Sequence, residues 1–383
     1  MNPSPPPLVC RELRLRDFRN FTDVTLSFPA GGVAVIGDNG AGKSNLLEAL
    51  YYLEIFRSFR GAQDEQLVRF GAEAFHIRGR FDAGSGAMVE ISAAYERRNR
   101  RKRVTVNDAE PERLADAIGK VGAVVFSPSD VALVSGAPTE RRRYLDIVLS
   151  LNEPGYLGAL QRYRSVLRQR NALLRDNAAP ALLASWDDAL VEWGSRIMEA
   201  RARWVHEKAD GFTARCEQIS AGSGMTVRYS PAVRHDGDAA GAARAGQGAE
   251  LLRAALARVA DRERERRMTL AGPHRDDLVF MLSSGGNQVD LREFGSGGQQ
   301  RTAAIALRMI EAETIRDTRR HEPIILLDDV FAELDPGRSR RILELIESEE
   351  HGQVVLTAPK ASDVEPRRGA LPHWTIRDGA IAT

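Results

Sequence analysis

The octapeptide GDNGAGKS, at Gly37–Ser44, has the spacing G-x-x-x-x-G-K-S that can hold a phosphate chain. The apolar run GVAVIG leads into it and the helical pattern NLLEALYYL follows it, so we expect it between a buried strand and a helix. Glycines let the backbone wrap the phosphates, the Lys43 ammonium places a charge on the β- and γ-phosphates, and the Ser44 hydroxyl can ligate Mg²⁺. A chance glycine-rich turn is the alternative, which the flanking elements disfavour. The predicted nucleotide-binding residues here are Gly37, Asp38, Asn39, Gly40, Ala41, Gly42, Lys43, Ser44 and Asn45.

A pair of carboxylates follows a second apolar run, in PIILLDDVFAELD. The run from Pro323 to Leu327 predicts a buried strand, and Asp328 and Asp329 stand at its end. We predict that Asp328 holds Mg²⁺, directly or through water, and that Asp329 polarises an attacking water. A strand ending in a solvated acidic turn is the alternative, and the phosphate-binding loop weakens it. The predicted catalytic residues are Lys43, Asp328 and Asp329, and the predicted metal ligands are Ser44 and Asp328.

A second glycine-rich segment, EFGSGGQQRTAAIALRM at Glu293–Met309, has no buried strand before it and no lysine. It runs into a helical pattern, whose N-terminus would favour a bound anion. Its SGGQ tetrapeptide resembles the signature motif of ABC-type ATPases, although Gly295 stands where a leucine usually precedes the serine. In that class the signature meets the γ-phosphate of ATP bound to a second subunit. The resemblance therefore implies an ATP-dependent homodimer and adds Ser296, Gly297, Gly298 and Gln299 to the predicted ATP-binding residues.

Positive charge is concentrated in two clusters, although the net charge is only +1. The segment RRNRRKR, at residues 97–103, holds six cations in seven residues on an expected hairpin tip, and residues 141–143 are all arginine. A solvated face is the usual explanation of a charge run, but concentration against a neutral background favours contacts to nucleic acid. Because no aromatic residues interleave, phosphate contacts without sequence readout are expected. The predicted DNA-binding residues are Arg97, Arg98, Arg100, Arg101, Lys102, Arg103, Arg141, Arg142 and Arg143.

The composition of the chain is that of a globular protein, with 383 residues, 43% hydrophobic and 28% charged. The two cysteines, Cys10 and Cys216, are too few and too far apart for a disulfide framework or a metal site. No apolar run is long enough to span a membrane, and the first residues lack the blocks of a signal peptide. We therefore expect a cytoplasmic protein that has no membrane partner.

The pattern of elements changes along the chain. Short strand patterns and one helix are expected from Leu13 to about Tyr95. Apolar stripes with helical spacing run from Leu160 to Leu174 and from Trp186 to Trp204, which predicts a helical hairpin rather than a stub of coiled coil. The glycine-rich stretch at 234–248 is interpreted as a flexible loop and 251–268 as a charged helix.

Strand signals return after residue 269, so the sheet domain is interrupted. The predicted fold class is α/β, an SMC-like ABC-type P-loop ATPase head. The head is predicted from residues 1–150 and 269–383 as one domain, and a helical arm from residues 151–268.

Further segments resemble the RecF family, in order and over nearly the whole chain. They are LRLRDFRNF, FSPSDVALVSGAPTERRRYLD at Phe126–Asp146, LRQRNALLR, LAGPHRDDL and LLDDVFAELD. The chain is identified on these segments as a member of that family, whose proteins resemble SMC heads with a short arm. The resemblance implies ATP-dependent dimerisation on DNA and slow, DNA-stimulated ATP hydrolysis. It also implies binding to duplex and single-strand gap junctions without sequence preference, and action with RecO and RecR in loading RecA.

Two residues and one segment have open roles. Gln63 is a candidate for the glutamine that contacts the metal in ABC ATPases, and Thr357 lies near the position of the usual switch histidine. Threonine can hydrogen-bond a phosphate or water but cannot carry the charge of an imidazolium, which is consistent with slow hydrolysis. The GPHRDD segment, Gly272–Asp277, is interpreted as a turn whose charges pair internally, with a role near nucleotide or DNA as the alternative.

Three other functions compete with this interpretation. An SMC-like DNA tether would need a longer arm or a zinc-hook Cys-x-x-Cys, which the sequence lacks. A transporter ATPase subunit would leave the arginine clusters unexplained. A scaffold that holds ATP without hydrolysing it remains an alternative, although the full set of phosphate, metal and water positions favours turnover.

Overall fold

The computed structural model describes residues 6–82, 84, 88–222, 224–233, 237–333, 335–348, 352–361 and 371–383. The chain divides into two compact units, one made of Met1–Asp130 with Glu311–Thr383 and the other of Val131–Ile310. Helix α11 (Gly297–Arg319) begins in the second unit and ends in the first. The predicted arm at 151–268 falls within the second unit, and its assignment as a separate domain stays a prediction.

The first unit contains a six-stranded sheet in the order β14-β13-β3-β12-β11-β7, in which all pairs but β13–β14 are parallel. Strands β3, β7, β11 and β12 are near-continuous apolar segments, as expected where both faces of a sheet are covered, whereas β13 and β14 alternate in burial. Their bounds are β3 (Gly32–Ile36), β7 (Ala123–Phe126), β11 (Ile324–Asp328), β12 (Val354–Ala358), β13 (His373–Arg377) and β14 (Ala380–Ala382). Helix α1 (Lys43–Ile55) follows β3 and is buried along almost its whole length, in agreement with its mostly apolar sequence.

A second, antiparallel sheet of the same unit has the order β2-β1-β4-β5-β6. Its strands alternate buried and exposed side chains, as in β1 and β5, because one face packs on the core. Their bounds are β1 (Val9–Phe18), β2 (Phe21–Ser27), β4 (Ala74–Asp82), β5 (Met88–Glu96) and β6 (Arg101–Val106). Short helices complete the unit: α2 (Asp64–Leu67), α3 (Leu114–Ala117), η4 (Val330–Glu333) and α12 (Pro336–Ser348).

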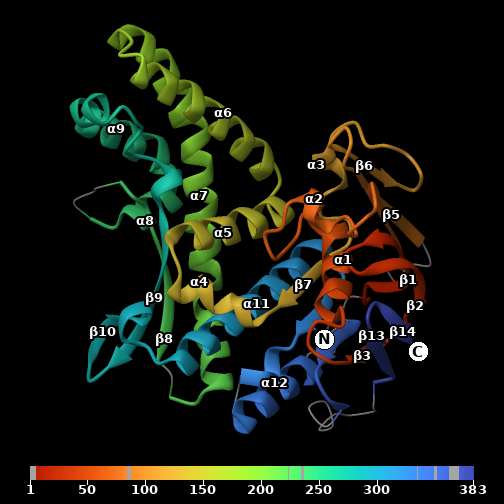
Figure 1. Cartoon of the computed structure of the whole chain (residues 1–383). Helices are drawn as coiled ribbons and strands as arrows, with labels where there is room; N and C mark the ends of the chain where they lie inside the picture. Colours follow the sequence, from red (N-terminus) through yellow and green to blue (C-terminus); the bar gives the residue numbers. More distant parts are fainter. Residues whose placement is uncertain are drawn as a thin grey trace. The chain divides into compact units, whose positions relative to one another are not determined.

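The second unit is mainly helical, and Figure 1 shows its longest helix, α7, with α6 packed along it. The predicted hairpin is confirmed as α6 (Tyr156–Arg175) and α7 (Pro180–Ile219), joined at 176–179. A three-stranded sheet, β10-β9-β8, completes the unit. The remaining bounds of this unit are α4 (Ala132–Ser135), α5 (Pro138–Asn152), β8 (Met225–Ser230), α8 (Ala239–Ala242), η2 (Ala243–Gln247), α9 (Gly248–Arg266), η3 (Pro273–Arg275), β9 (Asp277–Ser284), β10 (Asn287–Asp290) and α10 (Leu291–Phe294), and η1 (Pro128–Val131) spans the boundary between the units.

The flexible loop expected at 234–248 is wrong for most of its length. Residues 234–236 lie outside the described residues, but α8 and η2 cover 239–247, and α9 begins at Gly248. Alanine is the best helix former, and the single positive φ in the stretch, 83° at Gly246, is one that glycine adopts without strain. Strand β8 was not predicted, although Met225, Val227 and Tyr229 alternate with polar residues and are buried.

Buried ion pairs hold the helices of the second unit together. The Arg170 guanidinium of α6, only 3% exposed, donates to Glu263 of α9 at 2.7 Å and to Asp187 of α7 at 2.6 Å. Glu263 is 1% exposed and also accepts from the Leu270 backbone N–H at 2.7 Å. Three helices thus share one charged cluster, and loss of one member would leave a buried charge without its partner.

We expect Glu263→Ala to lower the free energy of unfolding of the second unit by about 3 kcal/mol, because it leaves the Arg170 guanidinium buried and undercompensated. Three of the four tryptophans, Trp186, Trp193 and Trp204, lie in α7, so tryptophan fluorescence during urea unfolding reports this unit once Trp374 of the first unit is replaced by phenylalanine. The matched control is Glu153→Ala, which breaks an exposed pair and should change stability by less than about 1 kcal/mol. Equal losses in the two variants would contradict a structural role for the buried cluster.

Candidate nucleotide-binding site

The glycine-rich loop at 37–42 connects β3 to α1, in the context that the sequence predicted. Gly40 and Gly42 have φ values of 86° and 115°, which only glycine adopts readily. A side chain at Gly42 would also meet the Asn20 amide at 2.5 Å, whereas no atom lies within 4 Å of the position that a Cβ of Gly40 would take. The loop is therefore braced on one side and open at its tip, where a phosphate chain needs space.

The Lys43 ammonium lies inside this loop, and the residue is only 4% exposed. It donates to the backbone carbonyls of Gly37 at 2.8 Å and Asp38 at 3.3 Å. The Asp329 carboxylate is 3.7 Å from the same nitrogen. A buried cation is thus held at the first turn of α1, where backbone N–H groups also favour an anion.

The Ser44 hydroxyl donates to the Asp328 carboxylate at 2.7 Å, although 284 residues separate the two. Asp328 ends β11 and is 7% exposed. Burial raises the pKa of the Asp328 carboxyl above its usual range, and the hydrogen bonds from Ser44 and Thr357 oppose that shift. The two predicted metal ligands are therefore brought together, and one is a carboxylate short of counter-charge.

This pair of oxygens fits Mg²⁺ in a nucleotide site. Mg²⁺ prefers hard oxygen ligands and is usually held by one or two protein oxygens together with phosphates and waters. The Ser44 hydroxyl and the Asp328 carboxylate supply two such oxygens from neighbouring elements. A cation there would offset the desolvation that raises the pKa of Asp328.

Thr357 links the two carboxylates of the acidic strand. Its hydroxyl accepts from the Asp329 backbone N–H at 3.0 Å and lies 3.1 Å from Asp328 Oδ1 and 3.4 Å from Asp329 Oδ1. Asp329 has a φ of 48°, uncommon for a residue with a side chain, and is 27% exposed on its side chain. The threonine thus contacts both carboxylates and holds the backbone turn at Asp329.

Two bracing residues were not predicted as members of the site. Asn20, in the turn between β1 and β2, donates to the Ala41 carbonyl at 2.9 Å and accepts from the Asn45 amide at 2.9 Å. Arg60 donates to Asn45 Oδ1 at 3.1 Å. Asn20 lies within the LRLRDFRNF segment, so that segment held a signal for its importance. Gln63 immediately precedes α2, where its backbone N–H donates to Gln66, and its contact with metal stays a prediction.

The SGGQ tetrapeptide forms the start of α11 in the second unit. The Ser296 hydroxyl accepts from the Gln299 N–H at 3.2 Å, and the Gln299 side chain accepts from the Ser296 N–H at 2.8 Å. This reciprocal arrangement is a capping box, and it fixes the first turn of the helix. Ser296 and Gly297 are exposed, so the helix N-terminus is accessible.

The first arginine cluster lies on the β5–β6 hairpin, which confirms the predicted hairpin. Arg97 is tied to the backbone carbonyls of Ala72 and Glu65, at 3.1 and 3.2 Å. Lys102 donates to the Phe56 carbonyl at 2.6 Å and pairs with Asp64 at 2.8 Å, and Arg103 pairs with Glu110. Among the described residues of the hairpin, Arg98, Arg100 and Arg101 are exposed and form no side-chain ion pair.

The prediction that Arg141 contacts DNA is wrong. Arg141 is 3% exposed, and its guanidinium forms a bidentate ion pair with the Asp277 carboxylate, with N–O distances of 2.7 and 2.9 Å. A buried, paired guanidinium cannot reach a phosphate. Arg142 is half-buried and donates to the Asp276 carbonyl at 2.8 Å, whereas Arg143 is exposed.

The predicted pairing of charges within the segment at 272–277 is wrong, because its charged groups pair with residues elsewhere in the second unit. Asp276 is fully buried and accepts from Tyr229, from the Ala232 N–H at 2.8 Å and from Arg201 at 3.4 Å. The His274 ring bonds to the Tyr163 hydroxyl at 2.6 Å, and burial lowers the pKa of His274 to about 4. The imidazole is therefore neutral near pH 7 and serves the core of the second unit.

The fold, the glycine-rich loop beside the acidic end of β11 and the SGGQ start of α11 define the class of SMC-type ABC ATPase heads. The chain matches the family described as RecF/RecN/SMC N terminal domain over residues 9–368. A solved Smc head domain of Pyrococcus furiosus shares the fold, with 16% identity, a TM-score of 0.56 and coverage of 98% of this chain and 95% of that one. No helix among the described residues is long and apolar enough to cross a membrane.

Within that class the chain belongs to the RecF family. It is 37% identical to the DNA replication and repair protein RecF of Salinibacter ruber, over 95% of this chain and 88% of the relative. It is 35% identical to the protein of the same name from Chloroflexus aurantiacus, over 96% and 98%. A solved structure of the recombination mediator protein RecF with ATP, in the RecFOR pathway, has a TM-score of 0.88, 29% identity and coverage of 100% and 99%.

We expect Asp328→Asn to raise the melting temperature of the nucleotide-free protein at pH 7. The folded-state pKa of Asp328 is raised, so the folded chain binds more protons than the unfolded one just above 3.8, and stability is lost as pH rises through the folded pKa. An amide keeps the shape and an acceptor for Ser44 but has no charge to bury. The gain should shrink as the pH falls toward 3.8, which thermal melts at several pH values would show.

The matched control is Asp108→Asn, at an exposed turn with a φ of 62° that asparagine tolerates, and it should show no such pH-dependent gain. A lower melting temperature for Asp328→Asn at pH 7 would contradict the idea that the site holds an undercompensated buried charge.

Proposed function

We propose that this chain is an ATP-dependent DNA-binding protein of recombinational gap repair and replication restart. The contact of Ser44 with Asp328 beneath an open phosphate-binding loop, in a chain of the RecF family, carries the proposal. Relatives in this family are named DNA replication and repair proteins, and one solved relative is a complex with ATP.

ATP binds in this proposal with its β- and γ-phosphates on the loop at 37–42. The Lys43 ammonium exchanges its carbonyl contacts for phosphate oxygens, and the backbone N–H groups at the start of α1 stabilise the same charge. Mg²⁺ held by Ser44 and Asp328 would neutralise charge on the phosphates during transfer. Asp329, held beside the site by Thr357, orients the attacking water.

Hydrolysis is proposed to be slow and stimulated by DNA. Thr357 occupies the place beside the two carboxylates, and its hydroxyl can donate only one hydrogen bond and carries no charge. It therefore lacks the cationic stabilisation that an imidazolium would give a developing phosphate charge. A slow enzyme of this kind uses ATP as a timer for a bound state.

ATP also joins two copies of the chain in this proposal. The exposed N-terminus of α11, at Ser296 and Gly297, binds the γ-phosphate of the ATP held by a second copy. A ligand at about 100 times its dissociation constant stabilises the state that binds it by about 2.7 kcal/mol. Two shared ATP molecules in a two-fold dimer thus change the dimer population strongly, and hydrolysis releases it.

DNA binding is proposed to use phosphate contacts from the β5–β6 hairpin, without sequence readout, on duplex and single-strand gap junctions. The ATP-bound dimer would act with RecR and RecO to help load RecA at gaps. The naming of the solved relative as a recombination mediator in the RecFOR pathway supports this assignment.

Sedimentation velocity with a short DNA duplex tests the dimer. We expect two protomers with ATP and one with ADP. Ser296→Arg should keep ATP binding and lose the ATP-dependent dimer. The bulky arginine side chain would fill the space at the N-terminus of α11 that the γ-phosphate of the other copy needs. Lys43→Ala should lose nucleotide binding itself. Nucleotide binding can be followed with a fluorescent ATP analogue.

A protein that stays monomeric on DNA when saturated with ATP would contradict the dimer mechanism. Intact dimers of Ser296→Arg would show that this serine does not bind the ATP of the other copy. Phosphate release in the presence of gapped DNA separates a slow ATPase from a scaffold that only holds ATP.

Replacement of Arg98, Arg100 and Arg101 together by alanine should weaken duplex binding equally for unrelated sequences. Loss of three phosphate contacts should reduce the slope of log affinity against log salt by about 2 to 3. Fluorescence anisotropy at several salt concentrations measures both quantities.

The charge-matched control replaces Arg11, Arg14 and Arg78, each of which is already paired with a carboxylate on the same sheet. If both triple variants lose affinity and slope alike, the hairpin has no special part in DNA binding.

A further inference from the structure

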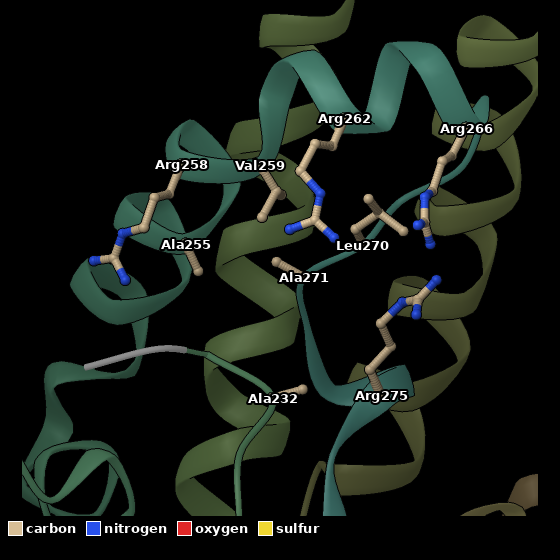
Figure 2. Close-up of a pocket in the computed structure, with 9 residues that line it drawn as sticks. All are labelled: Ala232, Ala255, Arg258, Val259, Arg262, Arg266, Leu270, Ala271 and Arg275. Atoms are coloured by element: carbon tan, nitrogen blue, oxygen red, sulfur yellow. The ribbon is translucent and has the colours of Figure 1, made fainter. Parts of the chain in front are cut away.

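A pocket in the second unit is lined by arginines and is separate from the predicted sites. It has a volume of about 310 Å³, and Figure 2 shows it between α9 and the segment that connects α9 to η3. All of its lining residues belong to Val131–Ile310. They are Ala232, Ala255, Arg258, Val259, Arg262, Arg266, Leu270, Ala271 and Arg275.

Three of the arginines lie four residues apart on one face of α9. Arg258, Arg262 and Arg266 follow one another at i, i+4 and i+8, where side chains are neighbours. Like charges at this spacing destabilise a helix, whereas an alternating acidic residue would have stabilised it. Two of the four acidic residues of α9 are engaged elsewhere: Glu263 pairs with Arg170 in the core, and Asp261 pairs with Arg264.

A fourth arginine faces this row from the segment 272–277. Arg275 donates its Nε to the Thr269 carbonyl at 3.2 Å, which leaves the tip of the guanidinium directed into the pocket. In Figure 2 the guanidinium groups of Arg266 and Arg275 point toward one another, with that of Arg262 beside Leu270. None of the nine described lining residues is acidic. Two guanidiniums that face each other repel, and an anion between them would satisfy both.

The floor of the pocket distinguishes the kind of anion. It is aliphatic, formed by Val259, Leu270 and three alanines, and no aromatic ring lines it. A nucleobase would have no ring on which to stack, so single-stranded nucleic acid gains little beyond its phosphates. A duplex is about 20 Å across and cannot enter a pocket of 310 Å³. A carboxylate-bearing peptide with one apolar side chain matches both the arginines and the floor.

We propose that this arginine pocket binds an acidic peptide segment of a partner protein. Its carboxylates take paired hydrogen bonds from Arg262, Arg266 and Arg275, because a guanidinium presents two parallel N–H groups that match a carboxylate. An aliphatic side chain of the peptide rests on Leu270 and Val259. The row from Arg258 to Arg266 spans about 12 Å along the helix, the length of about four extended residues.

This site gives the segment 272–277 a second role beside its part in the core. His274, Asp276 and Asp277 are engaged within the second unit, with Tyr163, Arg201 and Arg141 respectively. Arg275 is the member of the segment whose charged group lines a pocket. The bonds of its neighbours to Tyr163, Arg201 and Arg141 therefore hold the backbone at Arg275 in place for a ligand.

The test uses the full chain and a fluorescein-labelled peptide of sequence Gly-Asp-Leu-Glu-Asp-Gly, followed by fluorescence anisotropy. We expect Arg262→Ala with Arg266→Ala to weaken binding by about tenfold or more, since each loses charge-assisted hydrogen bonds. The matched control, Arg253→Ala with Arg264→Ala, removes the same charge from α9 outside the pocket and should bind within about twofold of wild type. The variant with lysine at 262 and 266 keeps the charge but lacks the paired N–H groups of arginine. Its affinity for the peptide should therefore lie between those of the double-alanine variant and the wild type.

Two comparison ligands decide the class of partner. The peptide with glycine in place of leucine should bind more weakly, because it leaves the apolar floor uncovered. A short oligo(dT) strand should compete poorly with the peptide. Equal losses in the pocket and control variants, or no effect of the leucine, would overturn the proposal. So would a strand that binds the pocket while the peptide does not, which would assign the pocket to nucleic acid. Thermal melts of each variant establish that the fold is kept.

Discussion

The place of β12 between β3 and β11 is the constraint on which the nucleotide site depends. Parallel pairing aligns Thr357 with Val35 on one side and with Asp328 on the other, so the carboxyl ends of three strands meet at one edge of the sheet. The phosphate-binding loop leaves from β3 at that edge, and the acidic turn leaves from β11. The hydrogen bond from Ser44 to Asp328 is a consequence of this register.

Buried charge is matched by protein groups in the core of the second unit but not at Asp328 of the first unit. In the second unit Arg201 is 2% exposed and donates to Asp146, Asp276 and the Pro273 carbonyl, so its charge is matched by protein groups. In the first unit Asp328 is nearly as buried, but its side-chain hydrogen bonds come from the hydroxyls of Ser44 and Thr357, and burial raises its pKa. A matched network stabilises a fold, whereas an unmatched buried charge marks a place for a ligand. In the arginine pocket, likewise, none of the lining residues is acidic, and a bound anion would match the charges of the arginines.

Much of the site could be predicted from the sequence because its signals are local. A glycine spacing between a strand and a helix, an apolar run that ends in two aspartates, and a Ser-x-x-Gln capping box each depend on residues close in the chain. The loop expected at 234–248 was wrong from residue 239 on, because the prediction rested on its glycines and overlooked the helix-forming tendency of its alanines. Arg141 was misassigned because a run of arginines on a helix does not tell which of them points inward, toward Asp277.

The sequence by itself determined the class of fold, the phosphate-binding loop, the acidic strand and the helical hairpin, since short-range patterns and periodicity encode them. Only the tertiary structure decided that Asn20 braces the loop, that Thr357 links the two carboxylates, and which cations of the hairpin stay exposed. It also placed Arg275 opposite the arginines of α9. These contacts join residues far apart in the chain, and their partners are set by strand order and helix packing, which no local pattern of residues specifies.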